Sequence, residues 1–278
     1  MLLAINAGVF SPESPVPEQL AAARRSGFAG IELVAAGDGP YTCHSDLKLC
    51  AEWARRAEEI GLAIVAVGCT QFWQANYASP ETAQRQVAHE RTLRLLDQAA
   101  ALRAVVVVIV PAVVGRADEP QARVTYLDAF NRVYDALAEL RFECEARGVV
   151  LAIENVWNRF LLSPLEAVEL LDRVNSPHVG FCLDTGNILP WGYPQDWIRT
   201  LGRHVSHVHV KDYDLSKPGR AGFCPLGEGH VAWPAVLAAL GEVRYDGPLV
   251  YEGKPPAEDA FARLTSIVAG APAAGKIP

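Results

Sequence analysis

The chain has 278 residues, 50% of them hydrophobic and 21% charged, and a formal net charge of −7. This composition is typical of a globular protein and argues against disorder, and the length allows one large domain with a substantial core. The negative net charge gives no sign of a basic surface that would bind nucleic acid, and it disfavours binding to an anionic membrane. We therefore expect small metabolites as partners, with no nucleic acid and no membrane.

The cysteines are scattered and form no CxxC pair, which predicts reduced thiols and a cytoplasmic location. The first residues, MLLAINAGVF, are apolar, but they lack a basic segment and a cleavage site before SPESP. We therefore expect neither a signal peptide nor a membrane span there.

Short apolar runs alternate with amphipathic stretches along the whole chain. The expected strands cover residues 2–6, 29–34, 62–68, 104–110, 149–154, 178–184, 205–211 and 247–252. Helical patterns fill the intervals, including residues 17–27, 47–61, 81–102 and 126–148. Glycine is expected to end several helices, at Gly27, Gly61, Gly148 and Gly241.

Strands that alternate with helices predict a parallel sheet with right-handed crossovers. An open doubly wound sheet would be favoured by a GxGxxG turn after the first strand, and NAGVFSPES contains none. We therefore predict a single-domain α/β protein, a (β/α)8 TIM barrel, over residues 1–269. The last segment, GAPAAGKIP at residues 270–278, is expected to be a loose tail.

Ionisable residues stand at the ends of the last four expected strands. Glu154 closes VVLAIE, Asp184 closes FCLD, His209 lies late in VSHVHV and Glu252 closes PLVYE. Active sites of TIM barrels form at the carboxyl ends of the strands, so these side chains can meet at one point. Buried carboxylates are costly unless they are paired, and a divalent cation would offset that cost. Oxygen and nitrogen donors without a thiolate suit Mn²⁺, Mg²⁺, Co²⁺ or Zn²⁺. The alternative is that each acid forms a structural ion pair or caps the next helix.

Further segments, in chain order, carry a family resemblance: AIENVWNRFLLSP, VGFCLDTGNI, HVHVKD, GEGHVAWPAVLAAL and YDGPLVYEG. The chain resembles the sugar phosphate isomerase/epimerase family, also called xylose isomerase-like TIM barrels, most densely from Val149 to Gly253. The run from Leu183 to Asp214 looks most like hexulose-6-phosphate isomerases and ketose-phosphate 3-epimerases. The resemblance implies one divalent metal ion, held by Glu154, Asp184, His209 and Glu252.

The resemblance also implies a reaction. A 2-hydroxy ketone bound to the metal through two oxygens has a polarised carbonyl, so the adjacent C–H is acidic and an enediolate is stabilised. Glu154 and Glu252 are the implied acid/base pair. Return of the proton to the opposite face gives an epimerase, and return to the neighbouring carbon gives an isomerase. The residues alone leave both outcomes open.

Several loop residues are candidate substrate contacts. Lys211 continues the inward face above His209 and could contact a substrate hydroxyl or phosphate, unless it forms a surface pair with Asp212 or Asp214. Arg159 and Arg220 could hold a phosphate, or they could be solvated surface residues. Trp157 and Trp191 could form an apolar wall against a sugar, or simply pack their loops.

Three polar residues extend this picture. Epimerases of free ketohexoses often carry a substrate-binding histidine three residues after the metal-binding aspartate, where this chain has Asn187, so a different substrate is favoured. His207 shares a strand face with His209 and could orient a ligand by a hydrogen bond, or it could be a satisfied core histidine. Glu32 could act in the same way if it faces the barrel, or it could pair within the helix layer.

Three other functions are open. A phosphodiesterase of the barrel endonuclease type would need a multinuclear site with several more histidines. His44 opens an expected helix and His89 lies inside one, so neither supplies such a ligand. A lyase of the inosose dehydratase type could use the same metal and acid pair. A non-catalytic metabolite-binding barrel is the third, although it would not require the full ligand set. A homo-oligomer is also expected from the resemblance.

Overall fold

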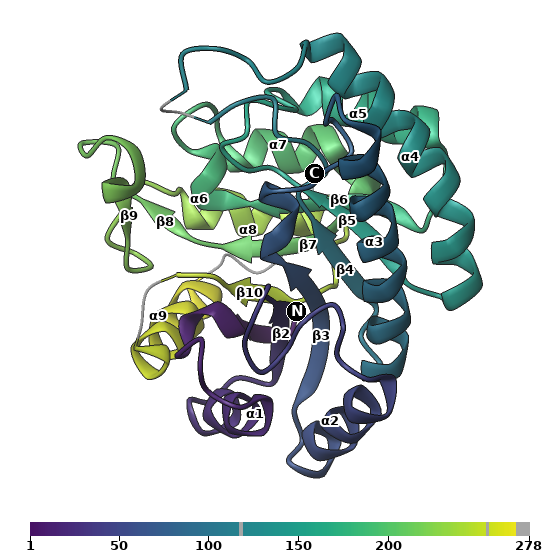
Figure 1. Ribbon diagram of the computed structural model, residues 1–278. Helices are drawn as coiled ribbons and strands as arrows, with labels where there is room; N and C mark the ends of the chain where they lie inside the picture. The colour runs from purple at the N-terminus through teal and green to yellow at the C-terminus, as the bar shows by residue number, and fades with distance from the viewer. Residues whose placement is uncertain (117–118, 254–255, 271–278) are drawn as a thin grey trace.

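Parallel strands form a closed barrel in this computed structural model, which describes residues 1–116, 119–253 and 256–270 (Figure 1). The order around the barrel is β1-β10-β7-β6-β5-β4-β3-β2. The barrel strands are β1 (Leu3–Asn6), β2 (Gly30–Ala35), β3 (Ala63–Cys69), β4 (Val106–Ile109), β5 (Val150–Glu154), β6 (Val179–Asp184), β7 (Val205–Val210) and β10 (Leu249–Tyr251). Each overlaps an expected strand, and the predicted (β/α)8 barrel is confirmed.

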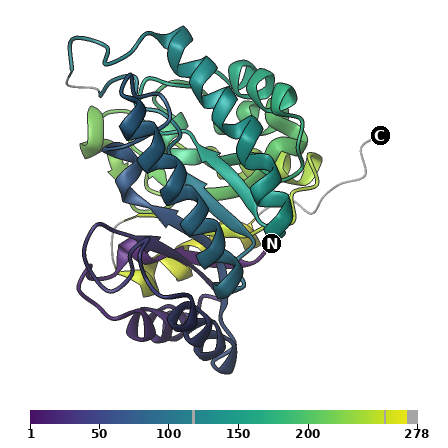
Figure 2. The ribbon, with the colours of Figure 1, turned by 45° about the vertical axis from the view of Figure 1, so that its right-hand side comes forward.

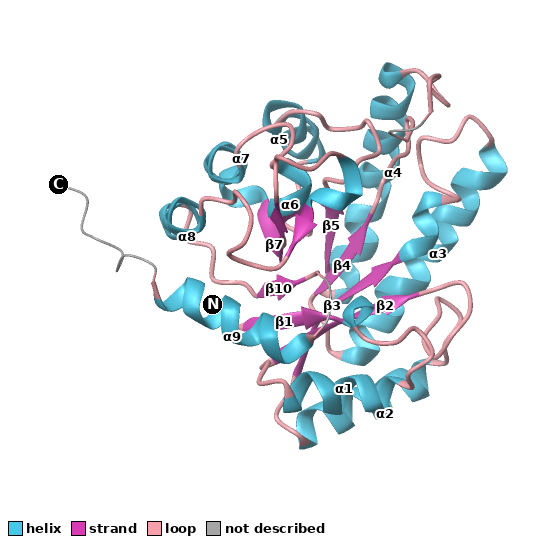
Figure 3. Ribbon diagram, turned by 90° about the vertical axis from the view of Figure 1, so that its left-hand side faces the viewer, coloured by secondary structure: helices cyan, strands magenta, loops and turns pink. Residues whose placement is uncertain are grey.

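Helices surround the strands (Figure 3), and the two longest, α3 and α4, run side by side on the outer face (Figure 2). The α-helices are α1 (Val16–Arg25), α2 (Leu47–Glu59), α3 (Thr82–Leu102), α4 (Tyr126–Arg147), α5 (Pro164–Val174), α6 (Thr185–Ile188), α7 (Pro194–Leu201), α8 (Trp233–Glu242) and α9 (Ala257–Ala269). Short 3-10 turns are η1 (Ala7–Val9), η2 (Thr70–Trp73), η3 (Gly202–His204) and η4 (Gly219–Gly222).

Local sequence sets the helix ends. Gly148 caps α4 in the left-handed region at φ 63°, as glycine there should. Ser163 and Glu166 form a reciprocal capping box at the start of α5. The expected stop at Gly241 is wrong, because that residue lies inside α8 and the helix ends at Glu242.

Between β7 and α8 the chain has an insertion that is not part of the regular alternation of strands and helices. Two short antiparallel strands, β8 (Asp212–Tyr213) and β9 (Phe223–Cys224), lie beside α6 at the carboxyl end of the barrel (Figure 1). They carry the connection that precedes α8. This insertion was not expected from the sequence, since each strand is too short to give a periodic pattern.

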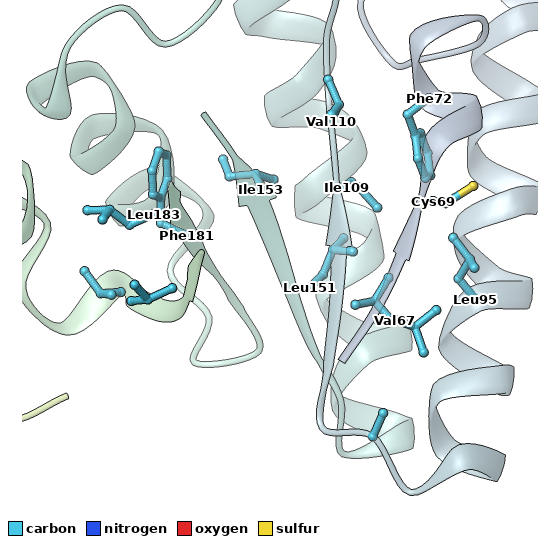
Figure 4. Packing of buried hydrophobic residues seen from close by; sticks show 14 of the residues in the cluster. Val67, Cys69, Phe72, Leu95, Ile109, Val110, Leu151, Ile153, Phe181 and Leu183 are labelled. Carbon is cyan, nitrogen blue, oxygen red and sulfur yellow. The ribbon is translucent and has the colours of Figure 1, made fainter. Parts of the chain in front are cut away.

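Two hydrophobic layers position the functional side chains. One layer fills the space between strands and helices, where Val67, Ile109 and Leu151 pack toward Leu95 of α3 (Figure 4). The other fills the barrel interior with Ala4, Val65, Ala66, Val106, Val108, Ala152, Cys182 and Val250. Side chains two positions apart share a strand face. The residues that follow this inner layer by two positions therefore also face inward, at the open end of the barrel.

Two further expectations concern the ends of the chain and the membrane. Of the expected tail at residues 270–278, only Gly270 is described, as the C-cap of α9; the remainder lies outside the described residues. Among the described helices, none is both long enough and apolar enough to cross a membrane.

Candidate metal centre

The side chains of Glu154, Asp184, His209 and Glu252 converge at the carboxyl end of the barrel. Each can offer one ligand atom so that all of these atoms lie within 4.8 Å of one another. Glu154 and Asp184 end β5 and β6, His209 is the penultimate residue of β7, and Glu252 follows β10 directly. The strand alternation explains this placement, since Ala152, Cys182 and Val250 of the inner layer lie two positions earlier.

His209 connects this centre to a deeper set of polar groups. Its Nδ1 lies 3.2 Å from Glu154 Oε1 and 2.9 Å from Glu252 Oε2. Its Nε2 lies 2.9 Å from Glu32 Oε2. Burial opposes the imidazolium, but the Cys182 sulfur and the carboxylates of Glu32 and Glu252 raise the pKa of His209 well above its usual range.

Glu32, His207 and Asn6 form what we call the inner cluster, one layer below the metal centre. The Asn6 amide donates to Glu32 Oε1 at 2.7 Å, and His207 Nε2 lies 2.7 Å from Glu32 Oε2. Gly68 on β3 leaves room for this carboxylate, because a Cβ there would lie 3.2 Å from Glu32 Oε1. Burial would raise the pKa of Glu32, but His209 and His207 outweigh it and lower that pKa well below its usual range. The two imidazoles therefore donate to an ionised carboxylate.

Lys211 lies within the metal centre. Its Nζ is 2.8 Å from Asp184 Oδ2 and 2.8 Å from Glu252 Oε2. The expected alternative, a surface pair with Asp212 or Asp214, is therefore wrong. Burial disfavours the ammonium, but Asp184 and Glu252 outweigh it and raise the pKa of Lys211 above its usual range.

The carboxylates of the centre differ in pKa. Burial raises the pKa of Glu154 to about 7 and also raises that of Asp184. Burial acts on Glu252 in the same direction, but Lys211 and His209 outweigh it and lower the pKa of Glu252 to about 2. Glu154 thus has a pKa near neutral pH, whereas Glu252 is ionised at that pH. Two carboxyl groups with such different pKa values suit acid/base chemistry, because one can hold a proton while the other accepts one.

Asp184 is held by two asparagines. Asn155 Oδ1 accepts from the Asp184 amide at 2.9 Å, and Asn187 Nδ2 donates to Asp184 Oδ2 at 2.9 Å. Asp184 Oδ1 also accepts from the Asn187 amide at 2.9 Å and so caps α6. Asp184 therefore caps a helix, as the alternative interpretation of the sequence predicted, and it also belongs to the metal centre. Asn187 contacts a candidate ligand here, and its predicted contact with substrate is untested.

Aromatic residues flank the centre. Trp157 stacks on Phe223 at 5.1 Å between ring centroids and donates from Nε1 to the Asn187 carbonyl at 3.0 Å. Tyr213 packs edge-on against both rings. Trp191 is 74% exposed and lies apart from this stack.

The Trp157–Phe223 stack adjoins two pockets, since Phe223 lines one and Trp157 lines the other. We call one the basic pocket; it measures about 390 Å³ and its lining includes Asn6, Lys211, Arg220, Phe223 and Glu252. We call the other the apolar pocket; it measures about 560 Å³ and its lining includes Trp157, Arg159, Leu161, Ile188 and Trp191. The structure thus separates the two candidate phosphate-binding arginines.

Sequence reasoning missed three residues that organise the site: Asn6, Asn155 and Asp212. Asn6 ends β1, and the same strand-end argument that found Glu154 could have found it. Asp212 is buried, and both its carboxylate oxygens accept N–H groups from the loop that precedes α8. No sequence signal predicts those long-range partners.

Fold and site together define a TIM barrel with a candidate metal centre at the carboxyl ends of its strands. The model of the family described as xylose isomerase-like TIM barrel matches residues 20–267. The chain therefore belongs to this family, as its sequence motifs predicted.

Named relatives include epimerases. The 2-epi-5-epi-valiolone 7-phosphate 2-epimerase of an Actinoplanes species is 30% identical over 233 residues, which cover 83% of this chain and 78% of the relative. The L-ribulose-5-phosphate 3-epimerase UlaE of Salmonella paratyphi C is 31% identical over 139 residues, which cover 48% of each chain. The solved structure of a D-tagatose 3-epimerase-like protein has a TM-score of 0.80 at 22% identity and covers 97% of both chains, which shows the shared fold.

Proposed function

We propose that this chain is a divalent-metal-dependent epimerase or isomerase of a small ketose or ketose phosphate. The observation that carries the proposal is the convergence of the ligand atoms of Glu154, Asp184, His209 and Glu252 within 4.8 Å. The family and its named epimerases support the reaction class.

The residues of the centre fit a divalent cation. Glu252 Oε2 is buried and lies close to Lys211 and His209, yet no hydrogen bond of acceptable geometry reaches it. Three carboxylates, of which Asp184 is buried and Glu154 and Glu252 are partly buried, lie beside one imidazole. This oxygen and nitrogen set suits Mn²⁺, Mg²⁺, Co²⁺ or Zn²⁺. When bound, such an ion polarises a ketone and makes the adjacent C–H acidic. Glu32 would fix the ring of His209 through Nε2 and leave Nδ1 for the ion.

The two glutamates are placed to move the proton. They come from β5 and β10 and flank His209 Nδ1 at 3.2 and 2.9 Å. One carboxylate removes the proton from the carbon beside the carbonyl, and the other returns a proton. Return to the opposite face inverts the carbon, and the named epimerase relatives make this epimerisation the outcome that we favour. Trp157 and Phe223 would exclude water from this step.

The test is proton exchange in D₂O, followed by NMR with the metal-loaded protein and a panel of ketoses, ketose phosphates and inososes. Deuterium at the carbon beside the carbonyl, together with a new sugar, would establish the chemistry. Glu154→Gln should stop exchange, whereas Glu139→Gln, at an exposed position of α4, should not. Loss of water from an inosose would assign the lyase instead. No exchange with metal bound would count against the proposal and favour a binding module.

We also infer a cytoplasmic location, because all six cysteines are free and a reducing compartment keeps thiols in that state. Fractionation of cells that express the full-length protein tests this inference; recovery outside the cytoplasm would contradict it.

A further inference from the structure

The two pockets beside the metal centre differ in the polarity of their linings, although the apolar pocket also includes Arg159. The apolar pocket is lined mainly by Trp157, Leu161, Ile188 and Trp191. The basic pocket shares Lys211 and Glu252 with the metal centre and adds Arg220. A small molecule held at the centre by one end can therefore extend into the basic pocket with its other end.

Arg220 lines this pocket from a turn that is packed onto Tyr213. The Tyr213 hydroxyl donates to the Gly219 carbonyl at 2.8 Å, and the Lys217 carbonyl is a second acceptor 3.1 Å away. Gly222 lies so close to the Tyr213 ring that a Cβ there would fall 2.2 Å from Cζ. The backbone around Arg220 is thus packed onto Tyr213, while the Arg220 side chain is exposed.

Within the described part of the chain, Arg220 has no recorded hydrogen bond or ion pair. Other arginines are paired with carboxylates, as Arg147 is with Asp97 and Arg199 with Glu242. An arginine on a fixed turn that lines a pocket beside a candidate active site is well placed to bind an anion.

The acids of the basic pocket, Asp212 and Glu252, each have partners other than Arg220. Asp212 accepts N–H groups on both oxygens, from backbone amides of the following loop and from Trp233 Nε1 at 3.1 Å. Glu252 is a candidate metal ligand. Lys211 is itself paired with Asp184 and Glu252, so Arg220 is the cationic side chain of this pocket for which the described part of the chain shows no ion pair.

We propose that the substrate carries a phosphomonoester at the end away from its carbonyl, and that Arg220 binds this group in the basic pocket. This inference rests on the proposed function, because it takes the carbonyl end to lie at the metal centre. The planar guanidinium matches two phosphate oxygens at once. The pocket volume of about 390 Å³ falls in the range of small-molecule sites.

The experiment compares each ketose phosphate with its free sugar on the metal-loaded protein, using D-ribulose 5-phosphate against D-ribulose and D-fructose 6-phosphate against D-fructose. We expect kcat/KM to be at least about tenfold higher for a phosphate that is turned over, as befits charge-assisted hydrogen bonds. Arg220→Gln should lower that value by about tenfold or more, mainly through KM, and leave the free sugar unaffected. Arg220→Lys should restore part of the loss.

The matched control is Arg244→Gln, since Arg244 is exposed and lies between α8 and β10, at the amino end of that strand, whereas the site lies at the carboxyl ends of the strands. It should leave both substrates unchanged. Equal loss on phosphate and free sugar in Arg220→Gln, or no loss at all, would overturn the inference. So would a ketose acid with a terminal carboxylate that is turned over as well as the phosphate.

A direct binding measurement separates this inference from the proposed function. Calorimetry with glycerol 3-phosphate, and with glycerol as its uncharged control, does not depend on turnover. Tighter binding of the phosphate that Arg220→Gln removes would support the pocket even if every proton-exchange assay failed. Equal binding to wild type and Arg220→Gln would overturn the inference even if the protein proved to be an epimerase of free ketoses.

Discussion

Two buried carboxylates, one strand layer apart, behave in opposite ways. Glu32 in the inner cluster is contacted by donors on both oxygens, from Asn6, His207 and His209, and its pKa is lowered. Glu154 in the metal centre has one such contact, from His209, and burial raises its pKa to about 7. Hydrogen-bond donors on both oxygens stabilise the ionised form of Glu32, so this carboxylate can hold its neighbours in place. Glu154 lacks such donors among the described residues, so its ionised form needs another positive partner. The comparison assigns the inner cluster to positioning and the metal centre to chemistry.

The largest effect is expected from the acid/base pair. Glu154→Gln and Glu252→Gln should each lower kcat by about a thousandfold, because each removes a positioned proton acceptor. Circular dichroism and the thermal midpoint should show that the fold is retained. Near-normal exchange of deuterium in either variant would remove that residue from the mechanism.

The second largest effect is expected on metal affinity, when the imidazole of His209 is removed from the metal centre. His209→Ala should lower the affinity for Mn²⁺ or Zn²⁺ by about a hundredfold, since it deletes a ligand and leaves Glu32 without one donor. Elemental analysis after dialysis measures the metal content. His204→Ala is the control, because His204 pairs with Asp172 away from the centre. Full metal occupancy in His209→Ala would show that another histidine is the ligand.

A smaller effect is expected from the inner cluster itself. Glu32→Gln should weaken metal binding by about tenfold to a hundredfold, because the amide no longer orients His209 as the carboxylate does. The visible absorption of the Co²⁺ form should shift with it. Glu52→Gln, which breaks only an exposed pair with Arg56, should change neither property. A Glu32→Gln protein that loses stability but keeps its metal affinity would make the inner cluster purely structural.

Much of this arrangement follows from strand alternation. Parity placed His207 and His209 on one face and brought Glu154, Asp184 and Glu252 to one end of the barrel, and the structure agrees. Contacts between distant segments were harder to predict. The partner of Lys211 was sought among its neighbours in sequence, yet residues 211 and 212 of an extended chain point to opposite sides. Lys211 consequently meets Asp184 and Glu252.

The contacts of Asp212 and Glu32 show the same limit. Asp212 organises the loop before α8 through backbone amides 15 to 19 residues away and also accepts from the Trp233 indole in α8. No local pattern encodes those bonds. Glu32 faces inward beside a register shift between Ile31 and Glu32, which period-two reasoning does not anticipate. The sequence therefore predicted which strand ends carry chemistry better than it predicted what each side chain touches.

The smallest expected effect is on pH dependence. Without metal, the pKa of Glu154 is about 7 in the folded protein, against 4.5 in the unfolded chain. The free energy of folding that the protonated carboxyl contributes is therefore fully present below pH 4.5 and is lost as the pH rises through 7.

Binding of a metal must displace the proton of Glu154, and also the proton of His209, whose pKa is raised well above its usual range. Metal affinity should therefore rise between pH 5.5 and 8, by about tenfold per pH unit for each proton displaced. Calorimetry in buffers of different ionisation enthalpy should find more protons released per ion at pH 6 than at pH 8. In Glu154→Gln this difference should disappear, and its persistence would assign the titration to another group.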